Sequence, residues 1–143
     1  MPRFVLLYHD CPPEYVRASH WDLMFEVGDS LRTLALRALP KNWHAAHLQT
    51  ATAFPASPAL ATENSVSAEP LGDHRREYLR YEGPLSDQRG RVSRIDAGTF
   101  KTLAQSEGRW QIKLAGHYIR GAITLTAGAA DTKQWTLTSH ECD

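Results

Sequence analysis

The stretch from His20 to Glu26 alternates polar and apolar residues and carries an imidazole and two carboxylates. Successive side chains of a β-strand point to opposite faces, so His20 and Asp22 would lie side by side on one face. Imidazole nitrogen and carboxylate oxygen together suit divalent metals of hard or borderline character. The same pattern also describes an ordinary half-buried strand whose polar face meets water. The intervening residues predict the core-facing side of the strand: Trp21, Leu23, Phe25 and Val27.

A second imidazole, that of His9, stands at the end of an expected strand over Phe4 to Tyr8. If this strand lies close to the His20 strand, two imidazoles and the Asp22 carboxylate come together. Such a set can hold a divalent ion and leave positions open for water and substrate. The sequence therefore predicts a metal site at His9, His20 and Asp22. Cys11 follows His9 by two residues and is either a further ligand or a free thiol.

A second group of chemically capable residues surrounds His74 and Tyr78, which are four residues apart in an expected strand over residues 74–82. In that strand Tyr78, Arg80 and Glu82 would share a face. Arginine's planar fork suits phosphate oxygens, and a histidine and a tyrosine add directional donors. The arginines could equally form a solvated face paired with nearby acids. The local arginines are Arg75, Arg76, Arg80, Arg89, Arg91 and Arg94.

Composition limits the classes of protein to which the chain can belong. Its 143 residues predict a single domain over 1–143. Lys plus Arg and Asp plus Glu each number 16, which excludes a global attraction to nucleic acid or acidic membranes. The sequence has no long apolar run and no signal peptide, so we expect a cytoplasmic protein without a membrane partner. Its cysteines, Cys11 and Cys142, predict no disulfide framework.

Many short alternating segments separated by glycine turns predict a mainly all-β fold, a small antiparallel barrel or sandwich with little helix. A hairpin is expected at Gly28–Ser30, and a flexible turn at Gly128–Thr132. The segment from Pro40 to Pro70 is expected to be a long irregular connection with a short helix near Ala59 to Val66. Two histidines in that segment have a spacing that could bind metal on a helix, or they are solvated loop residues: His44 and His47.

These motifs, taken in order, resemble the 3′-phosphoesterase domain of bacterial DNA ligase D and its free-standing relatives. The resemblance covers nearly the whole chain and is weakest from Pro40 to Pro70. The matching residues are His9, then His20-Trp21-Asp22-Leu23-Met24-Phe25-Glu26, then Asp73-His74, Tyr78 and Glu82-Gly83. Later matches are Gly98-Thr99-Phe100, Leu114-x-Gly116, Gly121 and Trp135-x-Leu137.

The resemblance implies a small β-barrel that trims the 3′ ends of DNA during repair, removing a terminal ribonucleoside and then the 3′-phosphate. It implies that His9, His20 and Asp22 hold a metal, manganese or alternatively zinc. His74 and Tyr78 would hold the scissile phosphate, and His74 could donate to a phosphate oxygen or to the leaving group. A ligase or polymerase partner would be a separate protein.

Two positions depart from the family pattern, because Met24 and Val66 stand where the family has phosphate-binding arginines. We expect Arg76 or Arg80 to substitute, and Arg80 is preferred because it would share a strand face with Tyr78. The departures keep two functions open. One is a metal-dependent phosphoesterase, and the other is a non-catalytic module of the same fold that binds a phosphate end or a repair partner.

Overall fold

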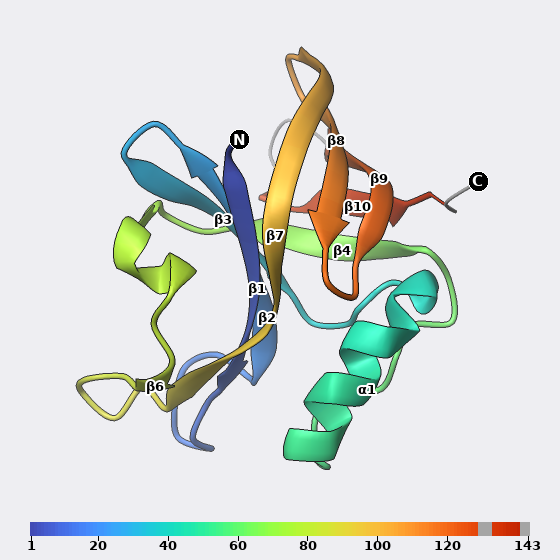
Figure 1. Cartoon of the computed structure of the whole chain (residues 1–143). Coiled ribbons are helices and arrows are strands. Elements are labelled where there is room, and N and C mark those ends of the chain that lie inside the picture. Colours follow the sequence, from blue (N-terminus) through green and yellow to red (C-terminus); the bar gives the residue numbers. More distant parts are fainter. Residues whose placement is uncertain (129–132, 141–143) are drawn as a thin grey trace.

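The computed structural model describes residues 1–128 and 133–140, and within these a ladder of antiparallel strands closes on itself (Figure 1). The order around the barrel is β1-β2-β3-β4-β10-β9-β8-β7, and pairing of β7 with β1 completes the circle. Residues 129–132 of the expected turn at Gly128–Thr132, and Cys142, lie outside the described residues. The predicted antiparallel β-barrel is confirmed. Its strands are β1 (Arg3–Asp10), β2 (His20–Val27), β3 (Ser30–Leu36), β4 (Ser65–Pro70), β7 (Arg91–Ser106), β8 (Arg109–Gly116), β9 (Arg120–Ala127) and β10 (Trp135–Ser139).

The barrel interior is filled by the alternate apolar side chains of its strands. Trp21, Leu23 and Phe25 are fully buried there, as their spacing predicts. Val27, the fourth residue expected on that side, is exposed at the end of the strand. The ring of Phe25 packs edge-on against Phe100 with centroids 5.1 Å apart. Each such side chain stabilises the fold by about 1.5–3 kcal/mol on burial, which holds β2 rigidly in the wall.

The segment between β3 and β4 is more ordered than its composition predicts. An α-helix, α1 (His44–Ala53), packs at one end of the barrel, so the expected irregular connection with a helix at 59–66 is wrong (Figure 1). Alanine, leucine and glutamine favour this helix, which ends before Pro55. The buried Thr50 hydroxyl accepts a hydrogen bond from Trp21 Nε1 at 3.0 Å. This bond ties the helix to the strand that carries Asp22.

The two histidines of this segment lie on α1. His44 is exposed, and a ring nitrogen of His47 bonds the carbonyl of Pro58 at 3.1 Å. One ring nitrogen of His47 is therefore already engaged by the backbone. No helix in the described part of the chain has the length and apolar character that crossing a membrane requires.

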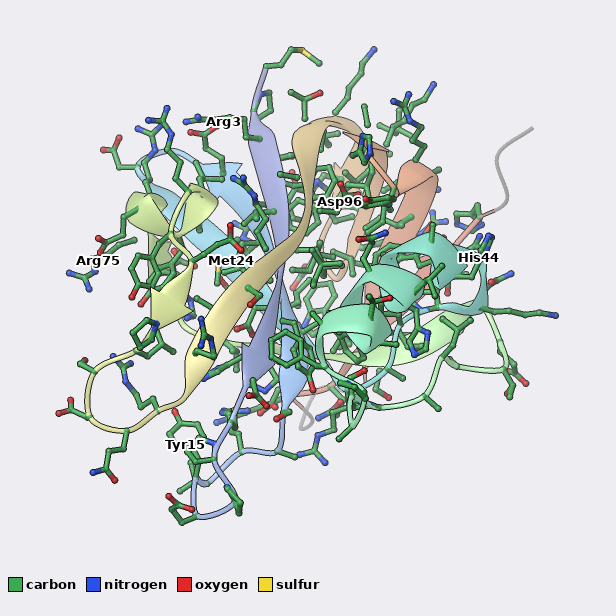
Figure 2. All side chains as sticks on the ribbon, turned by 60° about the horizontal axis from the view of Figure 1, so that its bottom comes forward. Arg3, Tyr15, Met24, His44, Arg75 and Asp96 are labelled. Carbon is green, nitrogen blue, oxygen red and sulfur yellow. The ribbon has the colours of Figure 1, made fainter. Side chains whose placement is uncertain are left out.

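The outward face of β1 and β2 is covered rather than solvated. Strand β5 (His74–Arg75) pairs with β3. The segment that follows β5 covers a second apolar cluster on the outward face of β1 and β2. Met24 on this face is only 1% exposed. In Figure 2 it lies between Arg3 and Tyr15. The buried members of the cluster are Val5, Leu7, Met24, Leu31, Leu79 and Val92.

The covering segment differs from its sequence prediction. The strand expected over residues 74–82 is wrong, because only β5 is extended and a 3-10 helix, Arg76–Leu79, follows it. A short strand, β6 (Gly83–Pro84), then pairs with β7. The helical turn brings Leu79 down onto the β1–β2 face, and burial of that side chain competes successfully with local strand propensity.

Candidate metal centre

Strand register brings the three predicted ligands together. His9 lies directly opposite His20 in the β1–β2 ladder, and Asp22 lies two residues further along β2. His20 Nε2 is 3.1 Å from Asp22 Oδ1, and His9 Nδ1 is 4.0 Å from Asp22 Oδ2. The three residues are only 8%, 4% and 4% exposed, respectively. The polar face of β2 is therefore a buried cluster at this end.

Hydrogen bonds to backbone carbonyls orient both imidazoles. His20 Nδ1 bonds the carbonyl of Ala18 at 2.8 Å, and His9 Nε2 bonds the carbonyl of Arg89 at 2.6 Å. In the neutral rings these bonds assign the protons to His20 Nδ1 and His9 Nε2. His20 Nε2 and His9 Nδ1 then offer lone pairs beside the same carboxylate. Such outer hydrogen bonds are how proteins orient histidine ligands toward a metal.

A glycine makes the His9 contact possible. A Cβ at Gly90 would collide with the carbonyl oxygen of Asp10, so only glycine lets the 86–90 turn pack against the end of β1. Its φ of +90° also lies in the region that favours glycine. The Arg89 carbonyl reaches His9 because of this close approach.

The Asp22 carboxylate is short of donors. Its Oδ1 is buried and has no hydrogen-bond partner, although His20 Nε2 is close. An unpaired buried carboxylate is costly in free energy, whereas a cation would compensate it. Burial lowers the pKa of His9 below its ordinary value, which favours the neutral form that a metal requires. Burial also lowers the pKa of His20, but the neighbouring Asp22 carboxylate outweighs this effect, and the pKa of His20 is raised overall.

Cys11 forms a second three-residue group with the two histidines, one that does not include Asp22. One ligand atom each from His9, Cys11 and His20 lies within 4.8 Å of the others, so these residues could hold a metal ion. Cys11 Sγ donates only a long hydrogen bond, 3.7 Å, to the carbonyl of His9. Burial, and secondarily the negative charges of Asp22 and Asp10, raise the pKa of this thiol to about 11.

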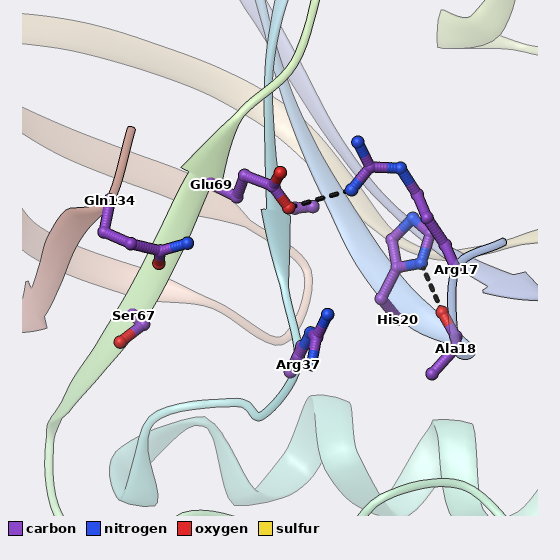
Figure 3. A pocket seen from close by; sticks show the side chains of 8 residues that line it. Arg17, Ala18, His20, Arg37, Ser67, Glu69 and Gln134 are labelled. Atoms are coloured by element: carbon purple, nitrogen blue, oxygen red, sulfur yellow. Dashed lines mark hydrogen bonds and ion pairs between the residues drawn. The ribbon is translucent and has the colours of Figure 1, made fainter. Parts of the chain in front are cut away.

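A cavity of about 330 Å³ adjoins His20 on the outward side of β2, β3 and β4 (Figure 3). Arg17 and Arg37 line it with Glu69 and Gln134, and Arg17 Nη1 contacts Glu69 Oε2 at 2.8 Å. The sequence reasoning missed both arginines. The alternation of side chains along a strand could have indicated Arg37. Asp22 pairs with Ala35, and Arg37, two residues after Ala35, belongs to the same side of the sheet.

The second predicted group forms a neighbouring but separate set of contacts. His74 Nδ1 bonds the carbonyl of Gly72 at 2.8 Å, and the His74 and Tyr78 rings lie 5.7 Å apart. Tyr78 shares a cavity of about 180 Å³ with Arg89, whose carbonyl bonds His9.

The two arginines expected to bind phosphate lie elsewhere. Arg76 pairs with Glu26. Arg80 is exposed just after the 3-10 helix, so the strand-face reason for preferring it does not hold.

A comparison with models of known protein families, and another with curated proteins, found no match to this chain. The resemblance to the ligase D phosphoesterase domain therefore stays a prediction.

Proposed function

We propose that the chain is a metal-dependent phosphoesterase that acts on the 3′ ends of nucleic acid. The observation that carries the proposal is the buried, donor-free Oδ1 of Asp22 beside the two oriented imidazoles. The adjoining arginine-lined cavity supplies the second requirement, a site for an anionic group within reach of the same residues. In the chain as a whole Lys plus Arg balances Asp plus Glu, so this local positive charge is meaningful.

The donor set fits a divalent ion. His9 Nδ1, His20 Nε2 and the Asp22 carboxylate would hold it, and their separations bracket the roughly 3.3 Å expected between neighbouring ligands of a tetrahedral zinc site. When bound, such an ion would polarise a phosphoryl oxygen and neutralise charge that develops on it. Manganese and zinc are the two candidates that these ligand types admit.

Two guanidinium groups would bind the phosphate oxygens in the cavity beside His20. Arg37 is exposed at its rim, and Arg17 reaches it from the loop between β1 and β2. Glu69 holds Arg17 in position and leaves part of its fork for a second acceptor. These arginines replace, in this proposal, the family arginines whose positions are Met24 and Val66.

His74 and Tyr78 are the residues proposed to donate to the remaining phosphate oxygens. They belong to the same outward side as the metal group, since His74 pairs with Leu31 and Leu31 pairs with Glu26. Glu26 is four residues from Asp22, about 13 Å along a strand. This separation makes the role of His74 a test of its own, distinct from that of Asp22.

The experiment uses a DNA primer that ends in a 3′-phosphate, with Mn²⁺ present, and measures released phosphate. The wild type should release phosphate, and both Asp22→Asn and His74→Ala should abolish release. Arg37→Ala should slow it by about 100-fold or more, as loss of a phosphate-binding arginine does elsewhere. Glu26→Gln is the matched control on the same strand and should leave release intact. Equal release by wild type and Asp22→Asn would refute the catalytic proposal.

A second candidate is a non-catalytic module that binds phosphorylated ends. One observation favours this candidate. Met24, at the position of a family arginine, is buried in an apolar cluster, so that position supplies no cation for a phosphate. The same assay separates the candidates. Binding of the phosphorylated primer without release, in the presence of either Mn²⁺ or Zn²⁺, would support the binding module.

A further inference from the structure

We infer that Cys11 is a fourth metal ligand and that its sulfur gives the centre a preference for zinc-type ions over manganese. The inference rests on the metal site of the proposed function but not on any phosphate chemistry. It also replaces the simpler alternative, in which Cys11 is a free thiol that only fills space at the end of β1.

The first support is the position of the sulfur. Cys11 Sγ lies within 4.8 Å of a ring nitrogen of both His9 and His20. In a tetrahedral zinc site a sulfur and a nitrogen ligand are about 3.5 Å apart, given bond lengths near 2.3 and 2.0 Å. A movement of about one ångström closes that difference, and rotation about the Cα–Cβ bond of Cys11 supplies displacements of that size.

The second support is the local backbone, which holds the cysteine toward the cluster. The Cys11 backbone N–H donates to Ser19 Oγ at 2.9 Å, and this bond ties the two ends of the β1–β2 loop together. Pro12 and Pro13 follow, which restricts the conformations of Cys11 and of the chain beyond it. The thiol itself makes only its long bond to the His9 carbonyl, so little is lost when it turns toward a metal.

An independent observation also indicates a cation at this place. Asp22 is 4% exposed, and its Oδ1 lacks a hydrogen-bond partner while lying against His20. Together the residues form a set of two imidazoles, a carboxylate and a thiol. Sulfur ligands select zinc and other thiophilic ions, whereas manganese and magnesium prefer oxygen.

The preference has a structural consequence. Four protein ligands fill a tetrahedral zinc site, whereas a catalytic site keeps one position for water or substrate. Ligation by Cys11 thus occupies the position that substrate would need. With a harder ion the sulfur stays uncoordinated, and three protein ligands remain.

The experiment titrates the chain with Co²⁺, which reports its own ligands by absorption, in a Cys142→Ser background that leaves Cys11 as its only cysteine. The cobalt-loaded protein should show a sulfur-to-cobalt charge-transfer band in the near ultraviolet. Cys11→Ser should lose that band and keep the visible bands of cobalt held by the remaining ligands. Competition titrations should show the ratio of Zn²⁺ to Mn²⁺ affinity falling by about tenfold or more in Cys11→Ser.

Cobalt binding without the charge-transfer band in the parent protein would overturn the inference and leave the metal site of the proposed function standing. An unchanged zinc-to-manganese ratio in Cys11→Ser would overturn it as well. Absence of any cobalt binding would overturn both proposals together. Cys11→Ala serves as a second variant, and the band of the parent protein decides the question even if neither variant folds.

Discussion

The outward face of β1 and β2 carries a carboxylate at each end, buried Asp22 at one end and partly buried Glu26 at the other, and their hydrogen-bond surroundings differ. Arg3 and Tyr15 mark these ends in Figure 2, with Met24 between them. At the Arg3 end, Glu26 accepts hydrogen bonds from the Arg3 backbone N–H at 3.0 Å and from the Arg3 and Arg76 side chains. At the Tyr15 end, Asp22 Oδ1 has no donor.

The difference separates a carboxylate that surrounding donors compensate from one that we propose to be a metal ligand. Hydrogen bonds from Arg3, with further help from Arg76, lower the pKa of Glu26 to about 2 even though burial opposes this. That carboxylate is fully compensated by the protein itself. Asp22 faces two imidazoles whose outer nitrogens are committed to backbone carbonyls, and its Oδ1 lacks a hydrogen-bond donor, so its charge is less well compensated than that of Glu26.

The largest expected effect contrasts Asp22→Asn with Glu26→Gln. Asp22→Asn removes a proposed ligand and should weaken Zn²⁺ or Mn²⁺ binding by about 100-fold or more. It also removes an uncompensated buried charge, so without metal its melting temperature should equal or exceed that of the wild type. Calorimetric titration and thermal melts with and without metal measure both effects.

Glu26→Gln should do the reverse, with lower stability and unchanged metal affinity. The comparison between the two ends fails if both variants weaken metal binding equally, or if Asp22→Asn destabilises the metal-free protein.

A third carboxylate, that of the buried Asp96, sharpens the same contrast. It accepts backbone N–H bonds from His117, Tyr118 and Ile119 at 2.8–3.0 Å, and a Cβ at Gly116 would sit too close to it. Asp96→Asn places an amide N–H₂ against these donors and should destabilise the fold by about 2–4 kcal/mol. Denaturant unfolding measures this loss.

In the folded fraction of Asp96→Asn, metal affinity should match the wild type, because Asp96 lies outside the metal group. A variant as stable as the wild type would mean that N–H donors do not decide how these carboxylates behave.

Local pattern was enough to predict the barrel and the grouping of His9, His20 and Asp22. Alternation along residues 20–26 and the turn at Gly28 determine which strands pair, and pairing determines which side chains meet. Two features depended on tertiary burial instead. Helix α1 is bonded to Trp21 through Thr50, and its weak amphipathic pattern gave no warning of that contact.

The segment after β5 was mispredicted for a related reason. Alternation in residues 74–82 is compatible with a strand, but Leu79 is buried in the same apolar cluster as Met24, and a 3-10 helix places it there. The same cluster buries Met24 on the side of β2 that alternation alone allowed to meet water. Arg17 was missed because it lies in an irregular loop, where sequence spacing says little about which groups converge.

A smaller effect concerns pH at the Arg3 end. The Glu26 pKa is lowered to about 2 from an ordinary 4.5, so its ion pairs stabilise the folded state above about pH 4.5. That contribution is lost as pH falls from about 4.5 toward 2. Because Arg3 and Arg76 are partly exposed, solvent screening limits the loss to on the order of 1–2 kcal/mol.

Glu26→Gln should remove this part of the acid sensitivity, so its stability should decline less than that of the wild type over the same range. Urea unfolding at about pH 5, 4 and 3 measures the difference in free energy of unfolding between the two proteins, which should be about 1 kcal/mol or more. Parallel curves for the two proteins would show that Glu26 is not compensated as its contacts indicate.

The smallest expected effect is that of Arg80→Ala, and it decides which end of the face receives phosphate. Arg80 is exposed, and its preference as a phosphate ligand depended on a strand that is instead a 3-10 helix. Its removal should change stability by less than about 0.5 kcal/mol and leave affinity for a 3′-phosphorylated primer essentially unchanged. Arg37→Ala, which changes the same residue type beside His20, should weaken that affinity clearly. If Arg80→Ala proves the more damaging of the two, the phosphate binds beside the 3-10 helix, and the cavity lined by Arg17 and Arg37 is not the phosphate site.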